Sequence, residues 1–367
     1  MLEHWLRPPP QKDFAAANWH SYQIGHQILR LSKEISDLKA VQVAIVGIEA
    51  KAANAIRKAL YALSMPFDAS AVVDLGNVRK KDPNFVIPLF KELLESNILP
   101  IVLGPDPSLA IMLYKALLEQ QSLLSLVAID QAVPFRGEGE PLAATYLDEL
   151  LDQKAYQPFH VGLIGVQRHL TPPATFDFAN EQHWDCIRLG NARANLQELE
   201  PIIRNGDLLL FHLSALKRTE APEQIGDSPI GFSLEEACQL TWYAGMSDKL
   251  KAFGVTGFQK MMANTPSTAS AIALLTWYFM DGFFNRKGDF PHTSDGLVEY
   301  IVEHKKLYAQ LTFWKSQRSG RWWLQVPVKT KSAHQRHRLI PCSYMDYKQA
   351  TQGELPERLY DAFRRFS

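Results

Sequence analysis

The sequence predicts an α/β fold built on a mainly parallel sheet, and two observations carry the prediction. Eight short runs of aliphatic and β-branched residues recur between residues 41 and 258. Amphipathic helical patterns, such as ANAIRKALYAL and NFVIPLFKELLES, separate most of these runs. Strands that are apolar throughout are buried on both faces, and intervening helices supply parallel crossovers. We therefore expect the strand C-termini to share one edge, where such folds bind ligands.

Each of the eight predicted strands is bounded by turn or helix-capping residues. In chain order they are VQVAIVGI (41–48), AVVDLG (71–76), LPIVLG (99–104), SLVAID (125–130), HVGLIGV (160–166), CIRLG (186–190), DLLLFHL (207–213) and FGVTGF (253–258).

The two ends of the chain differ from this pattern. Residues 1–40 contain three consecutive prolines and are expected to form an N-terminal arm before an α/β domain at 41–305. Residues 306–367 are expected to form a C-terminal extension packed on that domain, with a β-hairpin within 311–328 and a helix within 354–366. Because Trp322 and Trp323 are consecutive, they should face opposite sides of the hairpin. We expect one to pack on the domain and the other to be left for an interface.

Composition excludes several classes of function. Lys+Arg and Asp+Glu both number 39, so the net charge is zero, which argues against nucleic acid or anionic membrane as the main partner and permits self-association. The longest apolar stretch contains Asp281 and is too short to span a bilayer comfortably. Cys186, Cys238 and Cys342 are widely spaced, which favours free thiols and a cytoplasmic protein.

Polar residues follow two of the predicted strands. Asp106 and Ser108 lie after the third strand, and Asp130 ends the fourth. Carboxylates at strand C-termini can be metal ligands or general bases. They can also cap helices and loops, and we favour this structural role for both aspartates.

The seventh strand ends in His212, followed two residues later by Ser214. This spacing puts both side chains on one side of a strand. No carboxylate at suitable spacing orients the histidine, and the serine lies outside a G-x-S-x-G turn, so we do not expect nucleophilic catalysis. The chain also has no G-x-G-x-x-G, P-loop or HExxH motif.

Taken in order, three segments resemble motifs of the arginase/agmatinase/formiminoglutamase (ureohydrolase) family. LGPDPSLA corresponds to G-G-D-H-S, IDQAVPF to D-A-H-x-D, and FHLSALKRTEAP to S-x-D-x-D-x-x-D-P. The tail segments SGRWWLQVP, IPCSYMDY and ELPERLY are similar to the formimidoylglutamase branch. The resemblance implies a doubly wound, three-layer α/β/α fold with an eight-stranded, mainly parallel sheet.

Members of that family hold two manganese ions with six side chains, and this sequence keeps one of the six. The residues at the matching positions are Pro107, Asp130, Ala132, Pro134, Ser214 and Leu216. Proline, alanine and leucine side chains offer a metal no donor. We therefore expect a vestigial pocket, which also contains Asp106 and His212, with no metal cofactor and no catalytic residue. The resemblance then implies a binding or regulatory pseudoenzyme with an unknown small ligand, acting as a homo-oligomer or beside an active paralogue.

The alternative is a hydrolase that cleaves carbon–nitrogen bonds of linear amidines, such as formiminoglutamate or a guanidino compound. It would use a single or relocated metal held by Asp106, Asp130 and His212. Convergence of these three side chains on one point would favour the hydrolase. Filling of that space by Pro107 and Leu216 would favour the pseudoenzyme.

Overall fold

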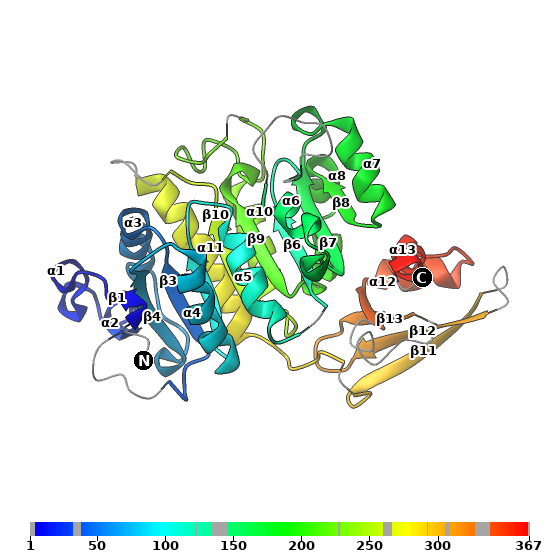
Figure 1. Ribbon diagram of the computed structural model, residues 1–367. Coiled ribbons are helices and arrows are strands. Elements are labelled where there is room, and N and C mark those ends of the chain that lie inside the picture. Colours follow the sequence, from blue (N-terminus) through cyan, green and yellow to red (C-terminus); the bar gives the residue numbers. More distant parts are fainter. Residues whose placement is uncertain are drawn as a thin grey trace.

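The computed structural model describes residues 4–31, 38–121, 123–133, 135, 145–226, 228–259, 266–291, 293–304, 309–326 and 338–365. Its main part is one sheet of ten strands in the order β1-β4-β3-β5-β10-β9-β6-β7-β8, with β2 also paired to β4 (Figure 1). The strands are β1 Leu6–Arg7, β2 Leu29–Arg30, β3 Val43–Gly47, β4 Val72–Val78, β5 Leu99–Leu103, β6 Ser125–Ile129, β7 His160–Val166, β8 Asp185–Arg188, β9 Leu208–His212 and β10 Ala252–Thr256.

The eight predicted strands all form, as β3 to β10, and they pair in parallel. The residues of β3 to β7, β9 and β10 are almost all buried, as a sheet covered on both faces requires, whereas those of the edge strand β8 are half-buried or exposed. The sheet is nevertheless wider than predicted, because β1 and β2 come from the first forty residues and both pair with β4. Gly76, at a φ of 81°, lets the chain around Arg7 approach β4, where a Cβ would meet the Arg7 carbonyl.

Helices cover both faces of this sheet in two layers. One buried cluster joins the sheet to α3, α8, α9, α10 and α11, and a second joins it to α4, α5, α6 and α7. The helices are α1 Gln11–Phe14, α2 Ile24–Gln27, α3 Ala50–Tyr61, α4 Pro83–Glu95, α5 Leu109–Leu118, α6 Tyr146–Asp152, α7 Pro173–Glu181, α8 Leu189–Ala194, α9 Glu200–Arg204, α10 Leu234–Gly245 and α11 Pro266–Phe284. No helix among the described residues is long and apolar enough to cross a membrane.

A second, antiparallel sheet forms near the C-terminus (Figure 1). Its strands are β11 Leu297–His304, β12 Ala309–Ser316, β13 Trp322–Gln325 and β14 Leu339–Cys342, and it packs with helices α12 Tyr344–Thr351 and α13 Glu357–Arg365. The predicted hairpin is confirmed as β12–β13 and the predicted terminal helix as α13. The division of the chain at residue 305 stays a prediction, although β11, which lies before it, pairs with β12.

The expectation that one hairpin tryptophan is left for an interface is wrong. The two side chains do face opposite sides, but both are buried. Trp322 stacks on Tyr347 of α12, with ring centroids 4.9 Å apart. Trp323 faces the main part of the chain and is only 1% exposed. Helices α12 and α13 therefore cover one face of the hairpin, and Arg204 of α9 lies against the other.

Arg204, at the end of α9, joins the C-terminal sheet to the main part of the chain. Its guanidinium lies 4.5 Å from the centre of the Trp323 ring and donates to the carbonyls of Trp322 (3.2 Å) and Cys342 (3.4 Å). Glu200 accepts from its Nε at 2.8 Å. Because Arg204 is 3% exposed, these contacts are made away from water, where a cation–π contact is strongest.

A buried histidine should make the protein sensitive to mild acid. His160 begins β7, and its Nε2 lies 2.8 Å from Asp185 in the neighbouring strand β8. Burial, assisted by the positive charge of Arg365, lowers the pKa of His160 to about 4 despite Asp185. Unfolding then takes up a proton between about pH 6.5 and pH 4, so the free energy of unfolding falls as the pH falls through that window.

We expect the free energy of unfolding to drop by roughly 2–3 kcal/mol between pH 7 and pH 4.5 because of this residue. Urea titrations at several pH values measure the loss. His160→Gln keeps a nitrogen donor but cannot take up a proton in this range, so its stability should vary less with pH. Equal pH dependence in the two proteins would show that His160 is not the cause.

Candidate functional site

The candidate site lies at the centre of the main sheet. Strands β5, β10, β9 and β6 are consecutive neighbours and run in parallel, so their C-terminal ends meet at one edge. Asp106 follows β5, Asp130 follows β6, His212 ends β9, and Gly257 follows β10. The predicted positions of Asp130 and Ser214 at adjacent strand ends are therefore confirmed.

Asp130, Ser214 and His212 form one hydrogen-bonded chain. The Ser214 hydroxyl donates to Asp130 Oδ1 at 2.7 Å, and the same oxygen lies 2.6 Å from His212 Nδ1. The Ser214 backbone amide also donates to His212 Nδ1, at 3.3 Å. Ser214 therefore contacts His212 through both its hydroxyl and its amide, and it holds the imidazole beside Asp130.

Asp130 has a partner that the sequence did not predict. Its expected role was to cap its own loop, most of which lies outside the described residues. The structure shows it accepting from the Ser214 hydroxyl, just after β9 and 84 residues along the chain. The Ser214 hydroxyl also connects His212 to a carboxylate, because His212 Nδ1 lies 3.5 Å from Asp130 Oδ1. The spacing of residues in the sequence did not reveal this neighbour.

Gly257 makes room for the imidazole. This residue has a φ of 77°, and a Cβ built on it would collide with the His212 ring. Its amide donates to the Pro105 carbonyl at 3.0 Å, which ties β10 to the loop after β5. A residue without a side chain and free to adopt positive φ is therefore needed beside His212.

A cavity of about 330 Å³ opens beside this hydrogen-bonded chain. Strand ends and the loop after β5 form one wall, and α6 forms another. The lining residues are Asp106, Pro107, Ser108, Ile111, Asp130, Thr145, Tyr146, Glu149 and His212. Burial, with a further contribution from Asp130, raises the pKa of Tyr146 well above its usual value, so its phenol stays protonated.

The other predicted pocket residues are not all at this cavity. Pro107 lines it. Leu216 is fully buried in the hydrophobic core instead, so of the two residues that could have filled the space only Pro107 is at the cavity. Ala132 is half-buried in the loop after β6, and Pro134 lies outside the described residues. Sequence reasoning missed Thr145, Tyr146 and Glu149, whose local signal is only the Thr145–Asp148 capping box that begins α6.

Solved structures with a similar fold include three ureohydrolase-type enzymes. Trypanosoma cruzi formiminoglutamase with Mn²⁺ aligns with a TM-score of 0.63 and 15% identity, over 72% of this chain and 99% of its own. Bacillus subtilis formimidoylglutamase aligns with a TM-score of 0.61 and 16% identity, over 72% of this chain and 92% of its own. Agmatine ureohydrolase of Thermoplasma volcanium aligns with a TM-score of 0.55 and 18% identity, over 73% of this chain and 96% of its own. No family model and no curated protein sequence matches the chain.

This chain has the arginase fold. The doubly wound sheet expected from the motifs is thereby confirmed, and with it the likeness to formimidoylglutamase structures. At identities of 15–18% the likeness concerns the fold, while the chemistry must be argued from the site itself.

The residues at the strand ends do not fit the manganese pair implied by the arginase fold. Asp130 shares its Oδ1 with Ser214, and Asp106 Oδ1 accepts from the Ser108 backbone amide at 2.9 Å. Two divalent ions need several anionic or imidazole donors around each ion, which Pro107 and Leu216 do not offer. Within the described ranges, His, Cys, Asp and Glu side chains form no group of three that could hold a metal.

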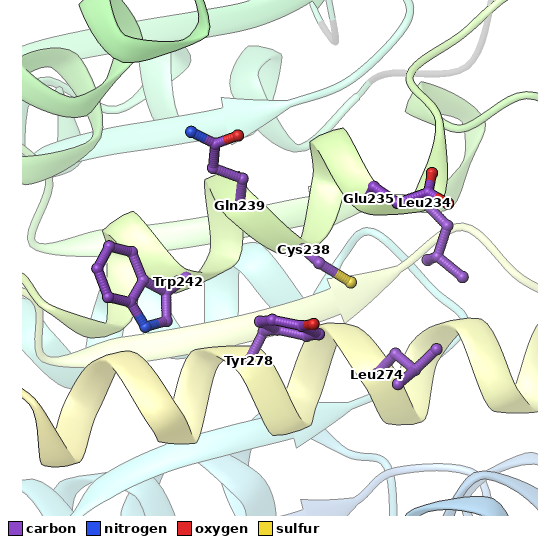
Figure 2. Close-up of a pocket in the computed structure, with 7 residues that line it drawn as sticks. All are labelled: Leu234, Glu235, Cys238, Gln239, Trp242, Leu274 and Tyr278. Atoms are coloured by element: carbon purple, nitrogen blue, oxygen red, sulfur yellow. The ribbon is translucent and has the colours of Figure 1, made fainter.

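Two further hollows lie away from the strand ends. A groove of about 390 Å³ runs between α10 and α11, where the Cys238 thiol and the Tyr278 ring face the space between the helices (Figure 2). Burial raises the pKa of Cys238 to about 12, so this thiol is not a nucleophile at neutral pH. The other hollow, of about 670 Å³, separates β8 from α13, and its lining includes the Arg358–Asp346 ion pair.

Proposed function

We propose that this chain is a non-catalytic binding or regulatory protein in which a small-ligand pocket occupies the arginase-fold metal position. The observation that carries the proposal is the Ser214 hydroxyl, which bridges Asp130 and His212. It donates to Oδ1 of Asp130, the one carboxylate that matches the family's ligand set. Ureohydrolase chemistry requires a metal-bound hydroxide, and the described residues around this position offer too few donors to hold the ions that would generate it.

The cavity chemistry supports a ligand that donates hydrogen bonds. Asp106, Asp130 and Glu149 line the cavity together with His212, so three carboxylates surround this space. A small compound with several N–H groups would satisfy these acceptors. We further propose that the chain functions in the cytoplasm, as its three free cysteines suggest, and as a homo-oligomer or beside an active paralogue.

The competing proposal is an amidine hydrolase with one metal at Asp106, Asp130 and His212. One observation favours it, because the three residues do line a single cavity. Against it, the Asp106 carboxylate binds its own loop and the Ser214 hydroxyl lies between the other two side chains. A single metal would compete with these contacts for Oδ1 of each aspartate and for Nδ1 of His212.

An activity assay separates the two proposals. We expect no release of ammonia or urea above background from formiminoglutamate, agmatine or arginine with added Mn²⁺, under conditions in which the Bacillus subtilis formimidoylglutamase turns over its substrate. Turnover that disappears in Asp130→Ala would contradict the binding proposal and establish the hydrolase. Turnover that survives this change would point to a contaminating enzyme.

A further inference from the structure

Strand β11 is a long, open edge of the C-terminal sheet. It has eight residues, against a typical strand length of about 5–6, and it pairs with β12 on one side only. Figure 1 shows it as the outer strand, with β12 and β13 between it and the main sheet, and β14 forms the opposite edge of the C-terminal sheet. Among the described residues, none forms a backbone hydrogen bond with its outer side between Val298 and Glu303. Such an edge is a template for another strand.

The two faces of β11 differ sharply. On the face toward α12, Tyr300 and Val302 are packed: the Tyr300 ring centroid lies 5.6 Å from that of Tyr347, and Val302 is 8% exposed. The opposite face carries Glu299, Ile301 and Glu303, all exposed, with Ile301 at 56%. An apolar residue thus lies between two carboxylates along the open edge.

We propose that β11 captures an extended segment of a partner protein as a fifth strand, and that the segment carries basic residues on either side of an apolar one. Backbone pairing along the edge would supply affinity, and alternate side chains would supply specificity. Lysine or arginine beside Glu299 and Glu303, with an apolar residue beside Ile301, matches the side chains that the edge presents.

A second copy of the same strand is a poorer occupant. In an antiparallel pairing centred on Ile301, Glu299 of one copy would lie opposite Glu303 of the other, at both ends of the pair. Like charges directly opposite one another destabilise a sheet. The acidic residues therefore disfavour self-pairing in this register, and they favour a basic strand.

A designed peptide tests the proposal with the full chain. Its central residues are lysine, isoleucine and lysine at every second position, with threonine between them, and it carries a fluorophore. We expect its fluorescence anisotropy to rise on binding, and the affinity to weaken as salt is raised from 0.05 to 0.5 M, because the charges are exposed. The double variant Glu299→Lys/Glu303→Lys should bind it about tenfold more weakly. The same variant should gain affinity for a peptide with glutamate in place of lysine.

Two controls isolate the edge. Glu95→Lys/Glu181→Lys makes the same charge change at exposed helix positions of the main part and should leave binding unchanged. A peptide methylated on alternate amide nitrogens keeps its charge but cannot pair with a strand, so it should not bind. Failure of the first peptide to bind, or equal binding of the methylated one, overturns the proposal. So does dimerisation in sedimentation runs that disappears in the Glu299→Lys/Glu303→Lys variant, since it would make a second copy the occupant.

Discussion

Asp74→Ala should lower the free energy of unfolding by roughly 3–5 kcal/mol, because it leaves a buried guanidinium without its carboxylate. Arg57 Nε donates to Asp74 Oδ2 at 2.7 Å, and both side chains are fully buried. Asp74 also accepts from the Tyr61 hydroxyl at 2.8 Å and from the Gly76 amide at 2.8 Å. The remaining Arg57 nitrogens donate to Asn77 and to the Gly76 carbonyl, so this network fixes α3 against β4.

A double-mutant cycle in urea measures the effect. Asp74→Ala and Arg57→Ala each leave the partner's charge buried and unpaired. The double variant should therefore lose less stability than the sum of the losses in the two single variants. The exposed pair Lys91–Glu119 is the matched control, since its 2.6 Å contact lies in water and should contribute about 0–1 kcal/mol. If the losses in unfolding free energy for Asp74→Ala and Arg57→Ala simply add in the double variant, the two side chains do not stabilise one another.

Trp323→Ala should lower the free energy of unfolding by about 3–5 kcal/mol. This side chain is 1% exposed and lies under the Arg204 guanidinium, so its removal opens a cavity where the second sheet meets the main part of the chain. The loss of stability should be greatest in strands β11 to β14. Amide hydrogen exchange should therefore become faster in these strands before it becomes faster in the main sheet.

Trp314→Ala is the control within the same sheet. Trp314 is half-buried and bonds Gln325 through Nε1 at 3.0 Å, so its loss should cost less than that of Trp323. Equal losses from the two changes would mean that the contact with Arg204 contributes nothing specific.

The sequence predicted the parts of the fold that depend on local pattern. Eight continuous apolar runs became eight parallel strands, because burial on both faces leaves a signal within each run. Strands β1 and β2 have two residues each and leave no such signal, so the arm was not placed in the sheet. Strand β14 was not predicted, because it contains Pro341 and a proline in a sequence argues against a strand. Proline is tolerated in β14 because this strand lies at the edge of its sheet.

The site was predicted less completely, because its contacts join distant residues. Asp130 and His212 were recognised at their strand ends, yet the bond through Ser214 spans 84 residues and appears only once β6 and β9 are adjacent. Leu216 was placed in the pocket by its motif position, but the chain turns after β9 and buries it in the core. Glu149 reaches the cavity from α6, on which no motif falls.

Elemental analysis for manganese tests the account of this site most directly. The protein is purified without chelators, incubated with excess Mn²⁺ and freed of unbound ions. We expect well below one manganese ion per chain, because the Ser214 hydroxyl bridges Asp130 and His212 and the described residues around them offer few further donors. Asp130→Ala should leave this content unchanged. Two manganese ions per chain, lost on Asp130→Ala, would contradict the account.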